Sequence, residues 1–147
     1  MSDKSRKQKS ASQGAGFLLW KAGNAWQRVV RENLRASGLT HVQFLLLDAI
    51  IEMEASGIRP SQVALSRVAG TDVMMTSKVI RTLEKDKLVA RKSNRTDGRA
   101  VVLQITTTGK RKALTARAAI RKADQDFFSR LVHKPARFYA NLVVLAE

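Results

Sequence analysis

Apolar residues recur at three- and four-residue intervals through the first third of the chain. Between Phe17 and about Leu34 this spacing predicts an amphipathic helix, apolar on enough of its surface to pack against a partner chain as well as its own core. After Gly38, the run Thr40-His41-Val42-Gln43 has the T-x-x-Q form of a capping box. A second helix is therefore expected from His41 to about Ala55, before Gly57. The apolar positions of the first helix are Leu19, Ala22, Trp26, Val29, Val30 and Leu34.

Two shorter helical patterns follow, and the turn between them contains glycine. Pro60-Ser61 opens a helix over Gln62–Ala69, and Gly70 supplies its C-terminal stop. Asp72 is a favourable N-cap for the next helix, from Val73 to about Asp86. Two helices separated by a turn of about three residues have the geometry of a helix-turn-helix.

The periodicity then changes from helix to strand. Leu88–Lys92 and Arg99–Ile105 are rich in apolar and β-branched residues, and the turn dipeptide Asp97-Gly98 lies between them, which predicts a β-hairpin. Thr106 and Thr107 can cap a further helix running to about Leu131, and Pro135 opens a last one over Ala136–Ala146. The expected fold class is mainly α with a small β-hairpin, a winged helix-turn-helix with a long helix on either side.

The charge of the chain indicates which class of partner this fold binds. The chain has 27 Lys and Arg against 12 Asp and Glu, a net charge of +15. Residues 59–112 contain thirteen basic and four acidic residues, a net +9. Such a concentration indicates a polyanionic partner, nucleic acid or an anionic membrane surface. Residues 1–13 are polar, basic and Ser-rich, and we expect a disordered arm that serves either as a solubilising tail or as a contact to DNA phosphates.

Several classes of function are disfavoured by what the sequence lacks. There is no cysteine, so disulfides, thiolate catalysis and thiol-based redox sensing are excluded. The two histidines, His41 and His133, lie far apart, which argues against a zinc site, and we expect no metal. No P-loop, dinucleotide fingerprint or nucleophile elbow occurs, so we expect no enzyme activity and no cofactor. No apolar run reaches the roughly 20 residues of a membrane span, and no signal peptide is recognisable. A cytoplasmic protein with no membrane partner is expected.

The helix after Asp72 is the main candidate for DNA contact. Its core face is predicted to be Thr76, Val79, Ile80 and Leu83. An exposed helix face with cations fits the major groove of B-DNA, where Lys78 and Arg81 can donate to guanine acceptors or phosphates. Hydroxyls can donate to phosphates, and methionines can contact thymine methyls. The alternative is a solvated face with two exposed methionines, which the adjacent cations make less favourable. The candidate DNA-contacting residues are Met74, Met75, Ser77, Lys78, Arg81, Thr82 and Lys85.

The predicted hairpin forms a basic wing. It carries Arg91, Lys92, Arg95 and Arg99, and Arg95, near the tip, is the best candidate for insertion in a narrow minor groove. Asp97 shares a face with Arg99 and is expected to orient an arginine rather than to meet DNA. A charged hairpin that only blocks edge pairing is the alternative, but four cations exceed what that purpose needs.

Three stretches of the chain resemble a known protein family. The run DGRAVVLQITTTG, residues 97–109, resembles the D-x-R-x-x-x-L-x-x-T-x-x-G wing signature of the MarR family of transcriptional regulators. The passage Ser77–Val89 is similar to that family's recognition helix and its approach to the wing. Gly38-Leu39-Thr40 with Gln43-Phe44 matches the start of its second helix. The resemblance covers Phe17–Glu147, but Met74 and Met75 stand where family members usually have small hydroxyl residues.

The resemblance implies an assembly and a regulatory ligand. Residues 14–37 and 107–147 would be dimerisation helices, and residues 38–106 the winged helix-turn-helix, in a homodimer that binds a pseudo-palindromic site in double-stranded DNA. Many members of the family release DNA when a small aromatic or phenolic effector binds. Candidate pocket residues are Trp20, Trp26, His41 and Phe44. Aromatic residues at helical spacing are more often core residues, and His41 is most simply an exposed residue of a first helical turn.

The sequence and the resemblance therefore predict a sequence-specific transcriptional regulator. We expect a repressor, with an activator and a regulator that no small molecule releases from DNA as alternatives. An alternative of another class is a sequence-nonspecific nucleic-acid-binding winged helix of the chromosome-organising or RNA-binding kind. The net charge of +15 keeps that alternative open.

Overall fold

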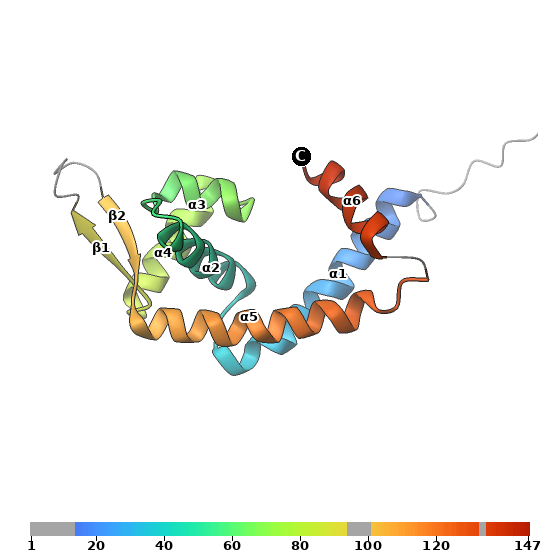
Figure 1. Ribbon diagram of the computed structural model, residues 1–147, viewed down its shortest axis with the longest axis horizontal. Coiled ribbons are helices and arrows are strands. Elements are labelled where there is room, and N and C mark those ends of the chain that lie inside the picture. Colours follow the sequence, from blue (N-terminus) through green and yellow to red (C-terminus); the bar gives the residue numbers. More distant parts are fainter. Residues whose placement is uncertain (1–13, 94–100, 133–134) are drawn as a thin grey trace, which may run out of the picture.

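The computed structural model describes residues 14–93, 101–132 and 135–147 as a helical protein with one β-ribbon (Figure 1). The predicted basic arm, residues 1–13, lies outside the described residues, as do Arg95, Asp97, Arg99 and His133. The elements, in chain order, are α1 (Ala15–Leu34), the 3-10 turn η2 (Arg35–Ser37), α2 (His41–Ala55), α3 (Gln62–Ala69), α4 (Val73–Lys85), β1 (Val89–Ser93), β2 (Val101–Ile105), α5 (Thr107–Phe128) and α6 (Pro135–Ala146).

Capping side chains set the helix starts. At α2 the capping box is complete: the Thr40 amide donates to Gln43 Oε1 at 2.9 Å, and the Gln43 amide donates to Thr40 Oγ1 at 3.3 Å. Ser61 Oγ accepts from the Ala64 amide at the start of α3. Gly70 ends α3 with φ 62°, in the left-handed region. Glycine adopts this conformation readily because it has no Cβ to clash with the backbone.

The core lies between α5 and the helices of the helix-turn-helix. Figure 1 shows α5 running from the base of the β-ribbon to the far end of the molecule, with α2, α3 and α4 above one half and α1 and α6 beside the other. Helix α2 packs against α3, α4, β2 and α5, so it is the central element of that half. Side chains that are fully buried or nearly so include Val30, Leu34, Leu46, Leu47, Ile50, Leu65, Ile80 and Leu83.

The two strands form an antiparallel ribbon in which Arg91 lies opposite Leu103. The Leu103 amide also donates to the Pro60 carbonyl at 3.1 Å, which joins β2 to the segment before α3. The first strand was expected to begin at Leu88 but begins at Val89. Lys87 has a positive φ of 56°, and the Leu88 amide donates to the Leu83 carbonyl at 2.8 Å, so these residues close the end of α4.

The long helix α5 ends earlier than the expected Leu131. Its last residue is Phe128, and Ser129 is the C-cap. The Ser129 hydroxyl donates to the Asp126 carbonyl at 2.8 Å, and the Leu131 amide donates to the Phe128 carbonyl at 3.1 Å. These local bonds satisfy the terminal carbonyls in a turn, which apolar periodicity alone does not reveal.

Arg117 joins α5 to α2 through two carboxylates. Its Nε donates to Asp48 Oδ1 and its Nη2 to Glu52 Oε1, each at 2.6 Å. The hydrogen bond to Asp48, followed by the other attractions of the two carboxylates, raises the pKa of Arg117. This fork holds the long helix against the centre of the helix-turn-helix half.

Replacing Arg117 with methionine is expected to lower the free energy of unfolding by about 1 kcal/mol, since two charge-assisted hydrogen bonds are lost. The effect is no larger because solvent reaches these groups and screens their charges. Urea denaturation followed by circular dichroism would measure the change. Lys122→Ala is the control, because Lys122 forms an exposed pair with Asp126 one turn away on the same helix. An equal loss in both variants would contradict a specific role for the Arg117 fork.

No single helix among the described residues is long and apolar enough to cross a membrane. Residues 15–37 and 41–55 are long and apolar enough only when taken together, and the chain bends by 70° at the break between them.

Candidate nucleic-acid interface

A network of hydroxyl and carboxylate contacts fixes the turn before α4. Asp72 Oδ1 accepts from the Met75 amide at 2.7 Å, as expected for an N-cap. The Thr76 hydroxyl lies 2.7 Å from the Thr71 hydroxyl and 2.9 Å from the Asp72 carbonyl, which explains how a threonine can be fully buried here. With Gly70 in the left-handed region, these bonds set the angle between α3 and α4.

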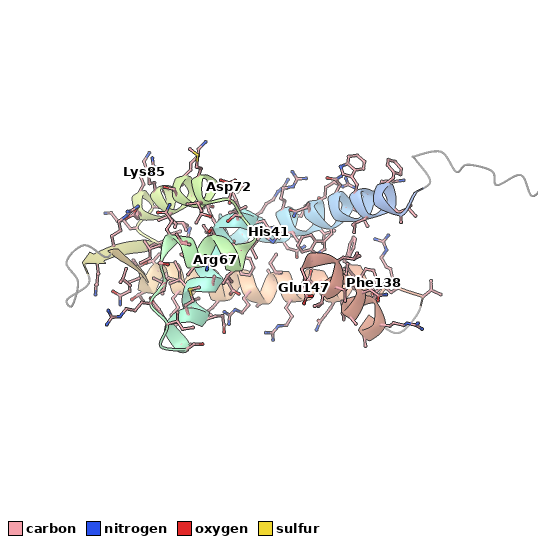
Figure 2. All side chains as sticks on the ribbon, turned by 90° about the horizontal axis from the view of Figure 1, so that it is seen from above. His41, Arg67, Asp72, Lys85, Phe138 and Glu147 are labelled. Atoms are coloured by element: carbon pink, nitrogen blue, oxygen red, sulfur yellow. The ribbon has the colours of Figure 1, made fainter. Side chains whose placement is uncertain are left out.

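Helix α4 has one buried face and one exposed face, as predicted. Thr76, Ile80 and Leu83 are fully buried, and Val79 is half-buried. On the opposite side, a stripe with spacings of four, three and four residues consists of Met74, Lys78, Arg81 and Lys85, all of which are exposed. Met75 and Thr82 are exposed beside it, and Ser77 is half-buried. Figure 2 shows Asp72 and Lys85 at opposite ends of α4, which lies along one edge of the molecule.

Two hydroxyls on this face already have partners within the helix. Arg81 Nη2 donates to Ser77 Oγ at 3.1 Å, and the Thr82 hydroxyl donates to the Lys78 carbonyl at 3.2 Å. The sequence predicted that both hydroxyls donate to phosphates. In this conformation the Thr82 proton is in use, while the Lys78 ammonium has no such partner among the described residues.

The base of the wing is bonded to α4. Arg91 Nε donates to Glu84 Oε1 at 2.7 Å. This pair was not predictable from the sequence, because the two residues lie on different elements. It draws one of the wing's cations toward the recognition helix, while Lys92 next to it stays exposed.

The Thr106–Gly109 part of the wing signature has a clear structural reason. The Thr106 hydroxyl donates to the Lys87 carbonyl at 2.8 Å and accepts from the Gly109 amide at 3.0 Å, so one residue caps α5 and holds the end of α4. A Cβ at Gly109 would lie 2.1 Å from the Leu88 carbonyl oxygen. Only glycine permits α5 to approach the start of β1 this closely.

A polar and aromatic cluster joins α1, α2 and α5 away from α4. Trp26 Nε1 donates to Asp124 Oδ1 at 2.7 Å. The His41 ring meets the Trp26 ring edge-on, with centroids 5.1 Å apart, and its Nδ1 lies 3.3 Å from Gln27 Nε2. The interpretation of His41 as an exposed first-turn residue is therefore wrong. It is half-buried, because α1 and α5 cover the start of α2.

Burial lowers the pKa of His41, and the Asp124 carboxylate opposes the shift only in part. The folded protein therefore binds fewer protons at this site than the unfolded chain does. Stability is expected to fall as pH drops below the ordinary histidine pKa of about 6.5. Urea midpoints at pH 7.5 and pH 5.5 would show the decline. His41→Gln should reduce it, and an identical pH dependence in both proteins would contradict the assignment.

A cavity of about 290 Å³ lies between α1, the end of α5 and α6. Its lining is almost wholly apolar and consists of Leu19, Ala22, Gly23, Trp26, Phe127, Phe128, Phe138 and Leu142. Of the four aromatic candidates named from sequence, only Trp26 lines it. Trp20 is exposed and stacked on Phe17, whereas Phe44 is buried in the core. The adjacent pair Phe127-Phe128 was the sequence signal that could have pointed here.

Within the described ranges, no three histidine, aspartate or glutamate side chains come together in a way that could hold a metal ion. The buried face of α4, its exposed cationic stripe and the adjoining ribbon together define a winged-helix DNA-binding protein.

Comparison with known proteins extends this conclusion to a family. The family model described as MarR family matches residues 39–101. The uncharacterised HTH-type transcriptional regulator YdcH of Bacillus subtilis is 42% identical over 119 residues, covering 81% of each chain. The protein belongs to the MarR family of DNA-binding transcriptional regulators, which are not enzymes.

More distant similarities agree with this assignment. An HTH-type transcriptional repressor of Mycobacterium tuberculosis, Rv2887, is 28% identical over 128 residues, covering 87% of this chain and 89% of its own. The fold is also that of Bordetella bronchiseptica BpsR, a protein whose DNA binding is regulated by 6-hydroxynicotinic acid. That structure has a TM-score of 0.79 and 24% identity over 92% of each chain.

Proposed function

We propose that the protein is a sequence-specific repressor that binds a pseudo-palindromic operator as a homodimer. The observation that carries the proposal is the stripe Met74, Lys78, Arg81 and Lys85, exposed along α4 beside a ribbon with basic residues. A helix of this kind enters a major groove about 12 Å wide, while a wing reaches the neighbouring minor groove. The repressor name of the M. tuberculosis relative supports the direction of regulation.

Exposed apolar side chains on two helices support the homodimer. Helix α6 has no buried residue within the described chain, although its composition is strongly apolar. Large apolar side chains left exposed together indicate an interface. They are Phe17, Leu18, Leu19 and Trp20 on α1, and Tyr139, Val143, Val144 and Leu145 on α6. In this proposal residues 14–37 and 107–147 dimerise, and residues 38–106 bind DNA.

A small aromatic effector is the proposed regulatory ligand. The apolar cavity beside Trp26 has a volume near the lower end for ligand sites, roughly 300–1,000 Å³. The regulation of BpsR by 6-hydroxynicotinic acid supports this class of ligand. Titration with 6-hydroxynicotinic acid and with a neutral phenol tests the proposal. The readouts are operator release and the fluorescence of Trp26 in a Trp20→Phe variant, in which Trp26 is the one remaining tryptophan. No response to either compound would count against the proposal.

Selection of bound fragments from random DNA, followed by salt titration of the selected and scrambled duplexes, tests sequence specificity. A specific regulator should prefer its site by roughly 10³-fold or more. A nonspecific nucleic-acid binder, the alternative that the net charge keeps open, would show equal affinities and the common electrostatic slope of about −0.9 per neutralised phosphate.

Analytical ultracentrifugation and footprinting test the dimer. The expected species is a dimer, with protected half-sites about 34–36 Å apart or a multiple of that spacing. A monomer at micromolar concentration, or a footprint without this periodicity, would contradict the proposed assembly.

A further inference from the structure

The two methionines of α4 differ from the other described methionine in their surroundings. Met74 is 84% exposed and Met75 is 44% exposed, whereas Met53 is only 9% exposed and belongs to the core. Met74 lies in the first turn of α4, two residues after the Asp72 cap, and heads the stripe that continues with Lys78 and Arg81. The thioethers therefore lie open to solvent on the surface proposed to meet DNA.

Methionine is the residue through which a two-electron oxidant can alter this surface. The chain has no cysteine, so no thiol competes for the oxidant. A thioether is soft, apolar and suited to thymine methyl groups, whereas its sulfoxide is polar, with an oxygen that only accepts hydrogen bonds. Phosphates and most polar groups on the base edges of the major groove are acceptors as well, and only the amino groups of adenine and cytosine donate. A sulfoxide at a thymine methyl group therefore loses an apolar contact and places its oxygen beside a group that cannot donate to it.

We propose that Met74 and Met75 form an oxidation site, at which a hypohalous acid converts the thioethers to sulfoxides and weakens binding to DNA. The inference rests on the proposed function of α4. In the net reaction with hypochlorous acid, the sulfur gains one oxygen atom and loses two electrons. The chlorine gains those two electrons and leaves as chloride, and a proton passes to solvent. A methionine sulfoxide reductase restores the thioether with two electrons from a dithiol, which becomes a disulfide, while the sulfoxide oxygen leaves as water with the two thiol protons.

Exposure sets the order of reaction. Hypochlorous acid should oxidise Met74 and Met75 before Met53, because the Met53 sulfur is shielded by the core. Peptide mass mapping of protein treated with increasing doses would follow each site. Bound operator should protect Met74 and Met75, since a helix in the groove excludes the oxidant. Oxidation of Met53 at the same dose, or unchanged rates on DNA, would overturn the assignment of the site.

The functional test compares each protein with itself before and after oxidation. At a dose that modifies both α4 methionines, the wild-type Kd for the selected operator should rise about tenfold or more, which corresponds to a loss of about 1.4 kcal/mol of binding free energy. Treatment with methionine sulfoxide reductases A and B should restore the initial Kd. Met74→Leu/Met75→Leu should show no such rise relative to its own starting Kd. Met53→Leu is the matched control and should respond as the wild type does.

The outcomes separate this inference from the proposed function. A wild-type protein that binds the selected operator equally well before and after both methionines are oxidised would overturn the oxidation site alone. An equal loss in the doubly substituted protein, or a loss that the reductases do not reverse, would also overturn it, since other side chains would then be responsible. Failure of the reduced wild type to prefer any DNA sequence would instead overturn the proposed function.

Discussion

Gly109→Ala is expected to lower the free energy of unfolding by about 2 kcal/mol or more, because the added methyl group has no room. The added Cβ would lie 2.1 Å from the Leu88 carbonyl oxygen and 3.1 Å from Ile105 Cγ1. The first of these atoms is backbone, so the chain rather than a flexible side chain has to move. The shift would separate the start of α5 from the base of the wing.

The measurement is urea denaturation at one fixed protein concentration, because dimerisation makes apparent stability depend on concentration. Gly23→Ala is the matched control, since no described atom beyond its chain neighbours and the backbone of its own helix lies within 4 Å of its added Cβ. Alanine is the better helix former by about 1 kcal/mol in a helix interior, so this variant should be as stable as the wild type or more so. Equal stability of Gly109→Ala and the wild type would show that the contact relaxes without cost.

Elements defined by neighbouring residues were predictable from the sequence. The capping box of Thr40 and Gln43, the glycine stop at Gly70 and the Asp72 cap all act within four residues, and the structure has each of them. The division of α4 into a core face and an exposed face follows from the same local periodicity. Short-range patterns in the sequence were therefore sufficient to predict these helices and the exposed face of α4.

Contacts between distant residues were not predictable in this way. The hydrogen bond from Trp26 to Asp124 spans 98 positions, and the one from Arg117 to Asp48 spans 69. No periodicity in one segment encodes its partner in another, which is why the half-buried state of His41 and the Arg91–Glu84 pair were missed. The early end of α5 has another cause, since serine bonding to a nearby carbonyl competes with continuation of the helix.

Substitutions on the exposed stripe of α4 are expected to have the largest effect on DNA binding. Lys78→Ala or Arg81→Ala should each weaken binding to the selected operator by about 10²-fold, because a contact to a base is worth roughly 1–3 kcal/mol and a homodimer loses it twice. Discrimination between operator variants should decline with the affinity. Arg95→Ala, in the sequence between β1 and β2, should instead weaken binding more evenly across sequences, since minor-groove readout is degenerate.

Fluorescence anisotropy with the selected operator and its single-position variants, at two or more salt concentrations, separates these effects. Lys122→Ala removes one positive charge from an exposed position on α5 and is the charge-matched control. If it weakens binding as much as Lys78→Ala does, total charge rather than the stripe determines affinity. If Lys78→Ala and Arg81→Ala both leave affinity unchanged at moderate salt, the exposed face of α4 does not enter the groove. A loss of discrimination confined to these two substitutions would instead establish α4 as the element that reads the operator.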